Sequence, residues 1–189
     1  MAFSVEWLDL AGAALIRPDR FGDERGWFEE TWSHAHLAKA GFEQEFVQDN
    51  LSFTAQIGTL RGLHYQLAPF AQGKLVSVVS GAVRDIIVDV REGSATYGQS
   101  FQIDLTEEDP TKLWCPPGFL HGFVTQRANT RFSYKVTARY SGDHDRSIAW
   151  NDPSLALDWG IDNPVLSDKD KAAPTLDQAG TPYPVGSLD

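Results

Sequence analysis

A short segment in the first half of the chain brings together side chains that can do acid–base chemistry. Residues 58–66 read Gly-Thr-Leu-Arg-Gly-Leu-His-Tyr-Gln, which is typical of a β-strand but contains Arg61 and His64. Basic groups in a largely buried strand need a compensating role, because burial of an unpaired charge is costly. Further polar residues lie on or beside later β-type segments: Lys74, Asp85, His121 and Tyr134. We predict that these side chains converge inside a β-barrel and form an active site around His64.

Each of these residues also has a purely structural interpretation. A single histidine such as His64 more often belongs to a core or edge hydrogen-bond network, and a lysine such as Lys74 is common at a solvated strand end. Asp85 would face solvent if the strand register were shifted by one residue. A tyrosine such as Tyr134 is more often a core aromatic residue with a hydrogen-bonded hydroxyl than a catalytic acid. His121 would simply support the turn before it. The catalytic interpretation gains weight because all of these residues occur together.

The composition and charge of the 189-residue chain restrict its partners. The net charge is −10, so nucleic-acid binding, which requires a basic face, is not expected. A small anionic ligand remains compatible with this charge if a local basic cluster binds it. The single cysteine, Cys115, cannot form an intramolecular disulfide, the first residues lack the pattern of a secretion signal, and no apolar run approaches the ~20 residues of a membrane helix. We therefore expect a cytoplasmic protein with no membrane association.

Short β-type segments separated by turn residues dominate the chain. We expect strands in residues 13–16, 27–32, 46–53, 58–66, 75–80, 83–90, 97–105, 112–115, 119–126 and 130–140. Residues 19–26 are expected to form a polar loop, and Ser33 is expected to cap a short helix that ends at Gly41. This spacing favours an antiparallel sandwich or barrel in one domain, residues 1–189, with an irregular tail from Ala172 onward.

Period-2 alternation assigns the side chains to the two faces of each strand. It places Asp85 on the same face as Val83, so that a polar group interrupts an apolar inner face, as a site inside a barrel requires. Strict alternation places Arg61 and His64 on opposite faces. Gly62 is compatible with a β-bulge that restores a shared face, and the alternative is that Arg61 serves a different surface.

Eight motifs occur in the order found in one enzyme family. They are DERGWFEE (23–30), QDN (48–50), LRGLHYQ (60–66), QGKLV (72–76), PPGFLHGF (116–123), YK (134–135), WNDP (150–153) and LSDKD (166–170). On these motifs the chain resembles the dTDP-4-dehydrorhamnose 3,5-epimerase family. The resemblance implies a mainly β fold, a cupin-like antiparallel β-jelly roll (double-stranded β-helix) with a few short helices, which agrees with the strand pattern.

The resemblance also implies an activity, the cofactor-independent conversion of dTDP-4-dehydro-6-deoxy-D-glucose to dTDP-4-dehydro-L-rhamnose in dTDP-L-rhamnose biosynthesis. The hydrogens on carbons 3 and 5 are α to the 4-keto group, so removing one gives an enolate, and returning a proton to the other face inverts the carbon. By position in the motifs, His64 resembles the base, with an unperturbed pKa of about 6.5 for an imidazole, and Tyr134 resembles the acid. Asp170 resembles the carboxylate that orients His64, and Asp85 is a second candidate for that role. Lys74 is placed to stabilise the enolate oxygen.

Other residues match family positions that contact the nucleotide sugar. These are Arg25, Glu30, Gln48, Asn50, Arg61, His121, Asp145 and Lys169. The arginines suit a diphosphate because a guanidinium group binds it in a bidentate way. Asp145 departs from the family's usual glutamate and has a shorter arm. The family forms homodimers with exchanged N-terminal strands, and we expect a homodimer here, in which Arg25 and Glu30 would act in the partner's site.

Other functions are known for cupin-like folds and for binders of sugar nucleotides. Many cupins hold a metal with a His-x-His pair, a glutamate and a later histidine, as metal-dependent dioxygenases do. Here the pair reads His-Tyr-Gln from His64, and Lys74 occupies the region of the glutamate, so we expect no metal and no cofactor. Epimerisation of one carbon of a related dTDP-4-keto sugar and non-catalytic binding of a sugar nucleotide remain alternatives. Tyr134 favours double epimerisation, and His64, Asp170 and Tyr134 together favour catalysis over binding.

Overall fold

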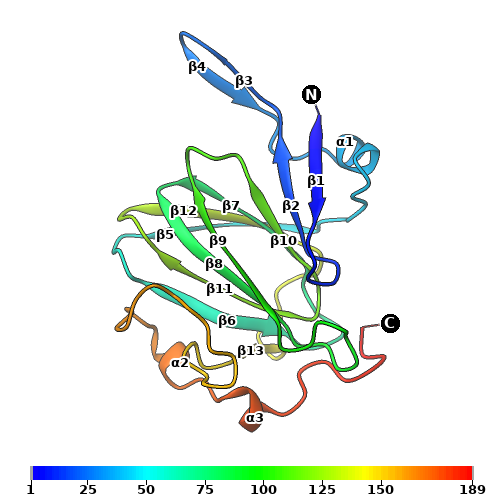
Figure 1. Cartoon of the computed structure of the whole chain (residues 1–189), viewed down its shortest axis with the longest axis vertical. Helices are drawn as coiled ribbons and strands as arrows, with labels where there is room; N and C mark the ends of the chain where they lie inside the picture. Colours follow the sequence, from blue (N-terminus) through cyan, green and yellow to red (C-terminus); the bar gives the residue numbers. More distant parts are fainter. Residues whose placement is uncertain (1, 189) are drawn as a thin grey trace.

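Antiparallel strands make up most of the computed structural model, which describes residues 2–188 (Figure 1). The strands are β1 (Phe3–Trp7), β2 (Ala14–Pro18), β3 (Arg20–Asp23), β4 (Gly26–Glu29), β5 (Gln48–Thr54), β6 (Leu60–Gln66), β7 (Lys74–Ser80), β8 (Ala82–Asp89), β9 (Ser100–Thr106), β10 (Lys112–Cys115), β11 (Phe119–Thr125), β12 (Thr130–Val136) and β13 (Asp145–Ser147). The helices are short: α1 (His34–Lys39), α2 (Asp168–Lys171) and α3 (Leu176–Ala179). Within the described residues, no helix has the length and apolar character needed to cross a membrane.

Two sheets form the body of the molecule. One has six strands in the order β1-β2-β10-β7-β12-β5, and the other has five in the order β13-β6-β11-β8-β9. The apolar side chains of both sheets meet in one cluster that includes Val76 of β7, Ile87 of β8, Phe123 of β11 and Phe132 of β12. The alternation in the sequence thus gives each sheet one apolar inner face, and the two faces pack together.

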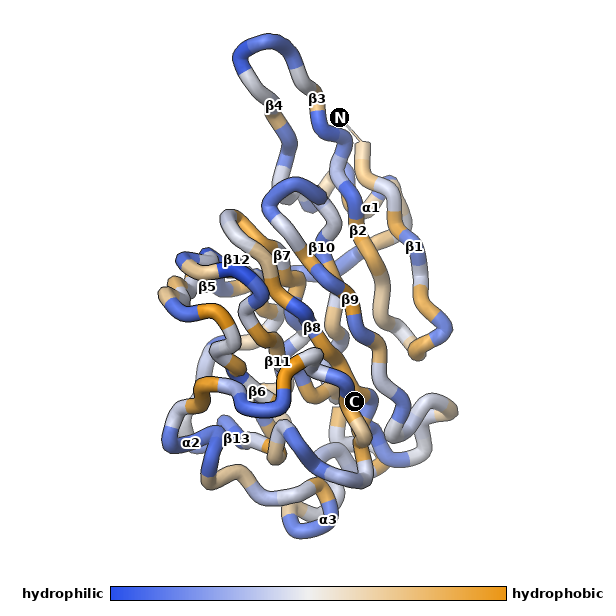
Figure 2. The backbone as a smooth tube through the Cα atoms, turned by 60° about the vertical axis from the view of Figure 1, so that its left-hand side comes forward, coloured by the Kyte–Doolittle hydropathy of each residue, from blue (hydrophilic) through white to orange (hydrophobic). Residues whose placement is uncertain are grey.

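The outer face of the five-stranded sheet is also apolar, and the C-terminal segment covers it. Ile86 of β8 and Leu120 of β11 pack there against Trp159 and Tyr183. Strands β8 and β11 are buried at nearly every position, although β8 also carries Arg84, Asp85 and Asp89. Figure 2 shows hydrophobic residues along both strands. The tail predicted to be irregular is ordered, because α3 has a capping box at Thr175 and the Tyr183 hydroxyl donates to the Gln66 carbonyl at 2.5 Å.

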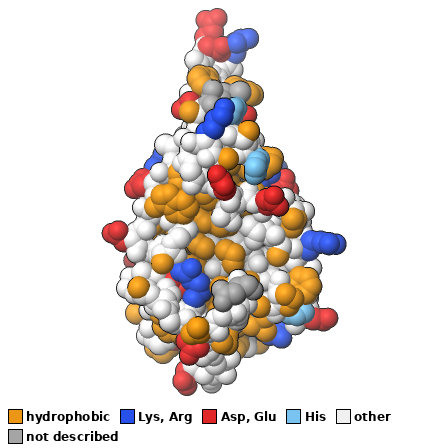
Figure 3. All heavy atoms as spheres, turned by 90° about the vertical axis from the view of Figure 1, so that its right-hand side faces the viewer, with side chains coloured by type: hydrophobic (Ala, Val, Ile, Leu, Met, Phe, Trp, Pro, Cys, Tyr) orange, Lys and Arg blue, Asp and Glu red, His pale blue; other side chains and the backbone are white. Residues whose placement is uncertain are grey.

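A two-stranded hairpin, β3–β4, projects from the body (Figure 1). Acidic and basic side chains gather at its tip, with hydrophobic ones below them (Figure 3). The expectation of a loop at residues 19–26 is therefore wrong. The strands pair from Arg20 opposite Glu29 to Asp23 opposite Gly26, and a 2.9 Å ion pair joins Arg20 to Glu29. One charged cross-strand pair, Arg20 with Glu29, and the facing aromatic pair Phe21 and Phe28 join the two strands, and apolar alternation does not reveal this hairpin.

The structure confirms two further local predictions, one strand and one helix. The predicted strand 112–115 coincides with β10, and the predicted helix is α1, in which Ser33 Oγ accepts from the His36 N–H at 3.4 Å. Gly41 follows that helix with φ +85°, the left-handed conformation that favours glycine. Strands β1 and β13 were not predicted, because both are short edge strands with few buried residues.

Candidate active site

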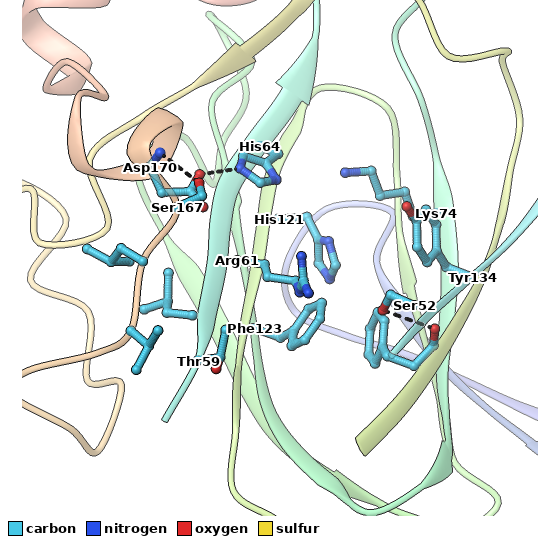
Figure 4. Close-up of a pocket in the computed structure, with 14 residues that line it drawn as sticks. Ser52, Thr59, Arg61, His64, Lys74, His121, Phe123, Tyr134, Ser167 and Asp170 are labelled. Carbon is cyan, nitrogen blue, oxygen red and sulfur yellow. Dashed lines mark hydrogen bonds and ion pairs between the residues drawn. The ribbon is translucent and has the colours of Figure 1, made fainter. Parts of the chain in front are cut away.

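A cavity of about 410 Å³ lies between the two sheets and beside the segment that leads into α2 (Figure 4). It is lined by Ser52, Thr59, Leu60, Arg61, His64, Lys74, His121, Phe123, Phe132, Tyr134, Val165, Leu166, Ser167 and Asp170. The structure therefore brings together all four residues predicted to carry the chemistry, His64, Lys74, Tyr134 and Asp170, and two of the predicted contact residues, Arg61 and His121.

His64 is held by a carboxylate from a distant part of the chain. Its Nε2 lies 2.6 Å from Oδ1 of Asp170, and the Ser167 hydroxyl donates to Oδ2 of the same carboxylate at 2.8 Å (Figure 4). Burial raises the pKa of Asp170, but hydrogen bonds from His64 and Ser167 and the nearby positive charges lower it further, to below its ordinary value. Asp170 is therefore a buried, ionised partner that fixes the His64 ring and leaves Nδ1 for the cavity.

A β-bulge brings Arg61 and His64 to the same cavity. His64 lies opposite His121 on β11, whereas Arg61 lies opposite Phe123, so three residue steps on β6 match two on β11. Gly62 sits at the bulge with φ +140°, and a Cβ there would lie 2.5 Å from the Gly122 Cα. The bulge interpretation is confirmed, and Gly62 is the residue that permits the close approach.

His121 has an aspartate of its own. Both carboxylate oxygens of Asp85 lie 3.0 Å from Nε2 of His121. The suggestion that Asp85 orients His64 is therefore wrong, because Asp85 faces His121 and Asp170 holds His64. Burial raises the pKa of Asp85 and lowers the pKa of His121, since a low-dielectric environment disfavours the charged form of each.

Lys74 and Tyr134 lie across the cavity from His64 (Figure 4). They come from β7 and β12 of the six-stranded sheet, whereas His64 comes from β6 of the other sheet. Neither polar end has a hydrogen-bond partner among residues 2–188, and neither is a buried orphaned atom, so both open to the cavity. Burial lowers the pKa of Lys74 and raises that of Tyr134, so the tyrosine keeps its proton at neutral pH.

Four other predicted contact residues lie near the cavity. Gln48 and Asn50 share the inward face of β5 with Ser52, which lines the cavity, and Gln48 Nε2 donates to Asn50 Oδ1 at 2.8 Å. Asp145 accepts from Lys169 Nζ at 2.5 Å, and Lys169 is the neighbour of Asp170 in the sequence. These residues are close to the cavity but do not line it.

Two predicted contact residues are not brought to this cavity. Arg25 lies at the turn of the projecting hairpin and pairs with Asp23. Glu30 follows β4, and its carboxylate lies 2.6 Å from Nδ1 of His36. Within one chain, therefore, the site lacks both of these side chains.

Sequence reasoning gave no role to Ser167, although it was part of a quoted motif. It accepts from the Asp170 N–H at 3.1 Å as the N-cap of α2, while its hydroxyl supports the Asp170 carboxylate. The pattern Ser-Asp-Lys-Asp is a helix-start signal and would have indicated this residue. Among the residues that the structure describes, no group of three or more His, Cys, Asp or Glu side chains is placed to hold a metal ion.

Residues 7–178 match a family model described as dTDP-4-dehydrorhamnose 3,5-epimerase. A protein of that name from Sinorhizobium fredii is 50% identical over 170 residues, which cover 89% of this chain and 87% of that protein. A crystal structure of the enzyme from Bacillus anthracis with TDP and PPi bound superposes with a TM-score of 0.90 at 43% identity, covering 93% of this chain and 100% of that one.

Two further solved structures bear on the site. A dTDP-6-deoxy-D-glucose-3,5-epimerase from Legionella pneumophila in complex with dTDP-4-keto-L-rhamnose has a TM-score of 0.89 at 40% identity, over 96% of this chain and 98% of that one. A 3'-monoepimerase from Streptomyces bikiniensis, solved as a His-to-Asn and Tyr-to-Phe double mutant with dTDP, has a TM-score of 0.88 at 28% identity, over 96% and 94% of the two chains. These likenesses confirm the predicted cupin-like jelly roll.

Proposed function

The chain belongs to the dTDP-4-dehydrorhamnose 3,5-epimerase family, and we propose that it inverts carbons 3 and 5 of dTDP-4-dehydro-6-deoxy-D-glucose to give dTDP-4-dehydro-L-rhamnose. The observation that carries this proposal is the placement of His64 with Asp170 on one wall of the cavity and Tyr134 on the wall formed by the opposite sheet. Inversion at a carbon needs one group on each face of the sugar, and two facing sheets supply them.

His64 acts as the base in this proposal. Its Nε2 is engaged by Asp170, so Nδ1 is the atom that takes the proton from carbon 3 or carbon 5. The ionised Asp170 stabilises the imidazolium that results, as the aspartate of a serine-protease triad does. Ser167 keeps the carboxylate in place through its second oxygen.

Tyr134 and Lys74 complete the reaction on the other wall. The neutral Tyr134 hydroxyl returns a proton from the face opposite His64. Lys74 Nζ, free of protein partners among residues 2–188, stabilises the negative charge that develops on the 4-keto oxygen. A well-placed donor to an oxyanion contributes about 3 to 4 kcal/mol to the transition state.

Arg61 supplies part of the local positive charge that an acidic protein needs for a nucleotide sugar. Its Nε donates to Thr54 Oγ1 at 3.2 Å, which leaves the two terminal amino groups for a phosphate. The relatives solved with TDP or with a dTDP sugar support a dTDP-linked ligand in this cavity.

A homodimer would supply the two residues that the single chain lacks at its site. The hairpin that carries Arg25 exposes Phe21, Trp27 and Phe28, and a projecting apolar hairpin is suited to pack on another chain. We place Arg25 and Glu30 in the cavity of the partner subunit. A cytoplasmic location agrees with the single free cysteine, Cys115.

Mixing two inactive variants tests this arrangement. Arg25→Ala lacks the donated side chain, and His64→Asn lacks the base, so a mixed dimer contains one complete site. Exchange of subunits should restore about a quarter of wild-type activity, because half of the dimers are mixed and each has one of two sites intact. No recovery, with mixed dimers verified, would show that Arg25 acts in its own chain, and full activity of Arg25→Ala alone would show that Arg25 has no part in the reaction.

Solvent exchange followed by NMR tests the activity itself. The protein is mixed with dTDP-4-dehydro-6-deoxy-D-glucose in heavy water, and a downstream reductase traps the product. Deuterium at carbons 3 and 5 is the expected result. Deuterium at carbon 3 alone would favour the single-carbon alternative, and tight binding without exchange would favour a non-catalytic binding module.

The single-carbon alternative deserves this direct test because Tyr134 does not decide it. The Streptomyces bikiniensis 3'-monoepimerase has a histidine and a tyrosine whose residue numbers differ by 70, and the numbers of His64 and Tyr134 differ by the same amount. The expectation that Tyr134 itself favours double epimerisation is therefore not supported. The 50% identity to a 3,5-epimerase favours inversion at both carbons.

A further inference from the structure

One fully buried carboxylate near the cavity has no task in the proposed mechanism. Asp85 on β8 has no solvent exposure, and its only side-chain hydrogen bonds among residues 2–188 are the two to His121 Nε2. On the neighbouring strand β11, Phe123 is directly opposite Asp85, so the aspartate reaches His121 diagonally across the sheet. A buried carboxyl group is costly unless it is hydrogen-bonded, and His121 is the partner that Asp85 has here.

We propose that Asp85 is a positioning residue for the same reaction, which holds His121 by Nε2 so that Nδ1 meets the substrate as a fixed N–H donor and not as a base. This inference rests on the proposed function, because the substrate oxygen is the 4-keto oxygen of that sugar. It gives the two histidines of the cavity different tasks.

The free atom of His121 faces the cavity. His121 lines the cavity, and within residues 2–188 its Nδ1 makes no hydrogen bond to protein. The buried side-chain atoms that lack a partner are the hydroxyls of Ser147 and Ser187, so Nδ1 is not among them and is open to the cavity. With Nε2 occupied by Asp85, Nδ1 is the one ring nitrogen that a substrate can contact.

The proton balance of the pair makes Nδ1 a donor. Burial raises the pKa of Asp85 and lowers that of His121, which favours the uncharged form of each group. In that state one proton lies between the Asp85 carboxyl group and Nε2, where the two groups are in hydrogen-bond contact, and the ring carries its own proton on Nδ1. The charged or titratable groups around the pair are Lys74, His64 and Cys115. An Nδ1–H beside Lys74 Nζ places two donors where negative charge develops on the sugar.

The tautomer of His121 can be measured without any substrate. Nitrogen shifts of the ¹⁵N-histidine-labelled wild-type protein, with His121→Asn to assign the signal, should show Nδ1 protonated and Nε2 as the hydrogen-bonded acceptor. A His121 signal with the proton on Nε2 and an unprotonated Nδ1 would overturn the proposal. This measurement does not depend on the enzyme assignment.

Two substitutions of Asp85 separate positioning from simple packing. In Asp85→Asn the amide can still donate to Nε2, so kcat/KM should stay within about tenfold of wild type. Asp85→Leu fills a similar volume but cannot hold the ring, so kcat/KM should fall by about 10²- to 10³-fold, mainly through kcat, as when an oxyanion donor is lost. Equal losses in both variants, with wild-type melting temperatures, would overturn the proposal.

The proposed function can fail separately. If the wild-type protein exchanged neither carbon 3 nor carbon 5 in heavy water, the enzyme assignment would fail, while the tautomer of His121 would still show whether Asp85 positions it. If exchange occurred and Asp85→Leu matched wild type, the activity would stand and the role of Asp85 would be wrong.

Discussion

Two histidine–aspartate pairs bring neighbouring histidines to the cavity, and they are built in different ways. His64 and His121 are cross-strand neighbours on β6 and β11. The aspartate of His64 comes from α2, 106 positions later, whereas that of His121 comes from the adjacent strand β8. The His64 side chain is 30% exposed and the His121 side chain 8% exposed.

The difference fits the two tasks that we propose for these histidines. A base becomes charged when it takes a proton, so it needs an ionised partner and access to the cavity. A fixed donor does not change its charge during the reaction. It can therefore be held inside a sheet by a carboxyl group that also stays uncharged. Residue types alone therefore do not distinguish the two pairs, and their surroundings do.

The largest expected effect tests the first pair. Asp170→Asn keeps the shape of the side chain but removes the charge that stabilises the His64 imidazolium, so kcat should fall by about 10³- to 10⁴-fold, as for the triad aspartate of serine proteases. Steady-state kinetics with the coupled reductase measures it. Asp152→Asn is the control, because Asp152 is equally buried in the C-terminal segment but, among residues 2–188, its side chain bonds only to Ser154 and Leu176. An Asp170→Asn loss below tenfold would contradict the assignment of His64 as base.

The next effect tests the bulge that brings Arg61 to the side of His64. Gly62→Ala places a Cβ 2.5 Å from the Gly122 backbone at φ +140°, so β6 and β11 must move apart. We expect a loss of about 2 to 4 kcal/mol in the free energy of unfolding, measured in urea, and a loss of activity of about 10²-fold.

Gly41→Ala is the matched control for this change. Gly41 also has positive φ, but a Cβ there meets nothing within 4 Å. It should cost about 1 kcal/mol of stability from backbone strain alone, with activity unchanged. Comparable losses of activity in both variants would contradict a specific role for the bulge.

The bulge is one feature of the site that the sequence alone predicts only in part. Alternation predicted most strands and placed Asp85 on an inner face, because two packed sheets impose a period of two. It could not decide between Asp85 and Asp170 as the partner of His64, because that choice depends on how the chain returns to β6 after more than 100 residues. Nor could it place Arg25 and Glu30, since a single chain leaves them outside the cavity.

A smaller effect tests the support behind Asp170. Ser167→Ala removes the hydroxyl that donates to Oδ2 and caps α2, so kcat should fall by about tenfold and stability by about 1 kcal/mol. Thr175→Ala removes the equivalent cap of α3, whose residues do not line the cavity, and should lower stability only. If both substitutions affected kcat equally, the loss would reflect general destabilisation and not the position of Asp170.

The smallest effect is a pH dependence that has opposite signs for the two aspartates. The pKa of Asp170 is lowered on folding, so its ionised form stabilises the protein above the ordinary value of 3.8, and this contribution is lost as the pH falls through the lowered pKa. The pKa of Asp85 is raised by burial, so its ionisation costs the folded state stability as the pH rises above 3.8.

In urea denaturation, the stability advantage of wild type over Asp170→Asn should shrink as the pH falls below 3.8. Relative to Asp85→Asn, with His121 present in both proteins, wild type should instead gain stability as the pH falls toward 3.8. The same sign for both substitutions would mean that the two aspartates share one protonation state, and the distinction between base support and fixed donor would be lost.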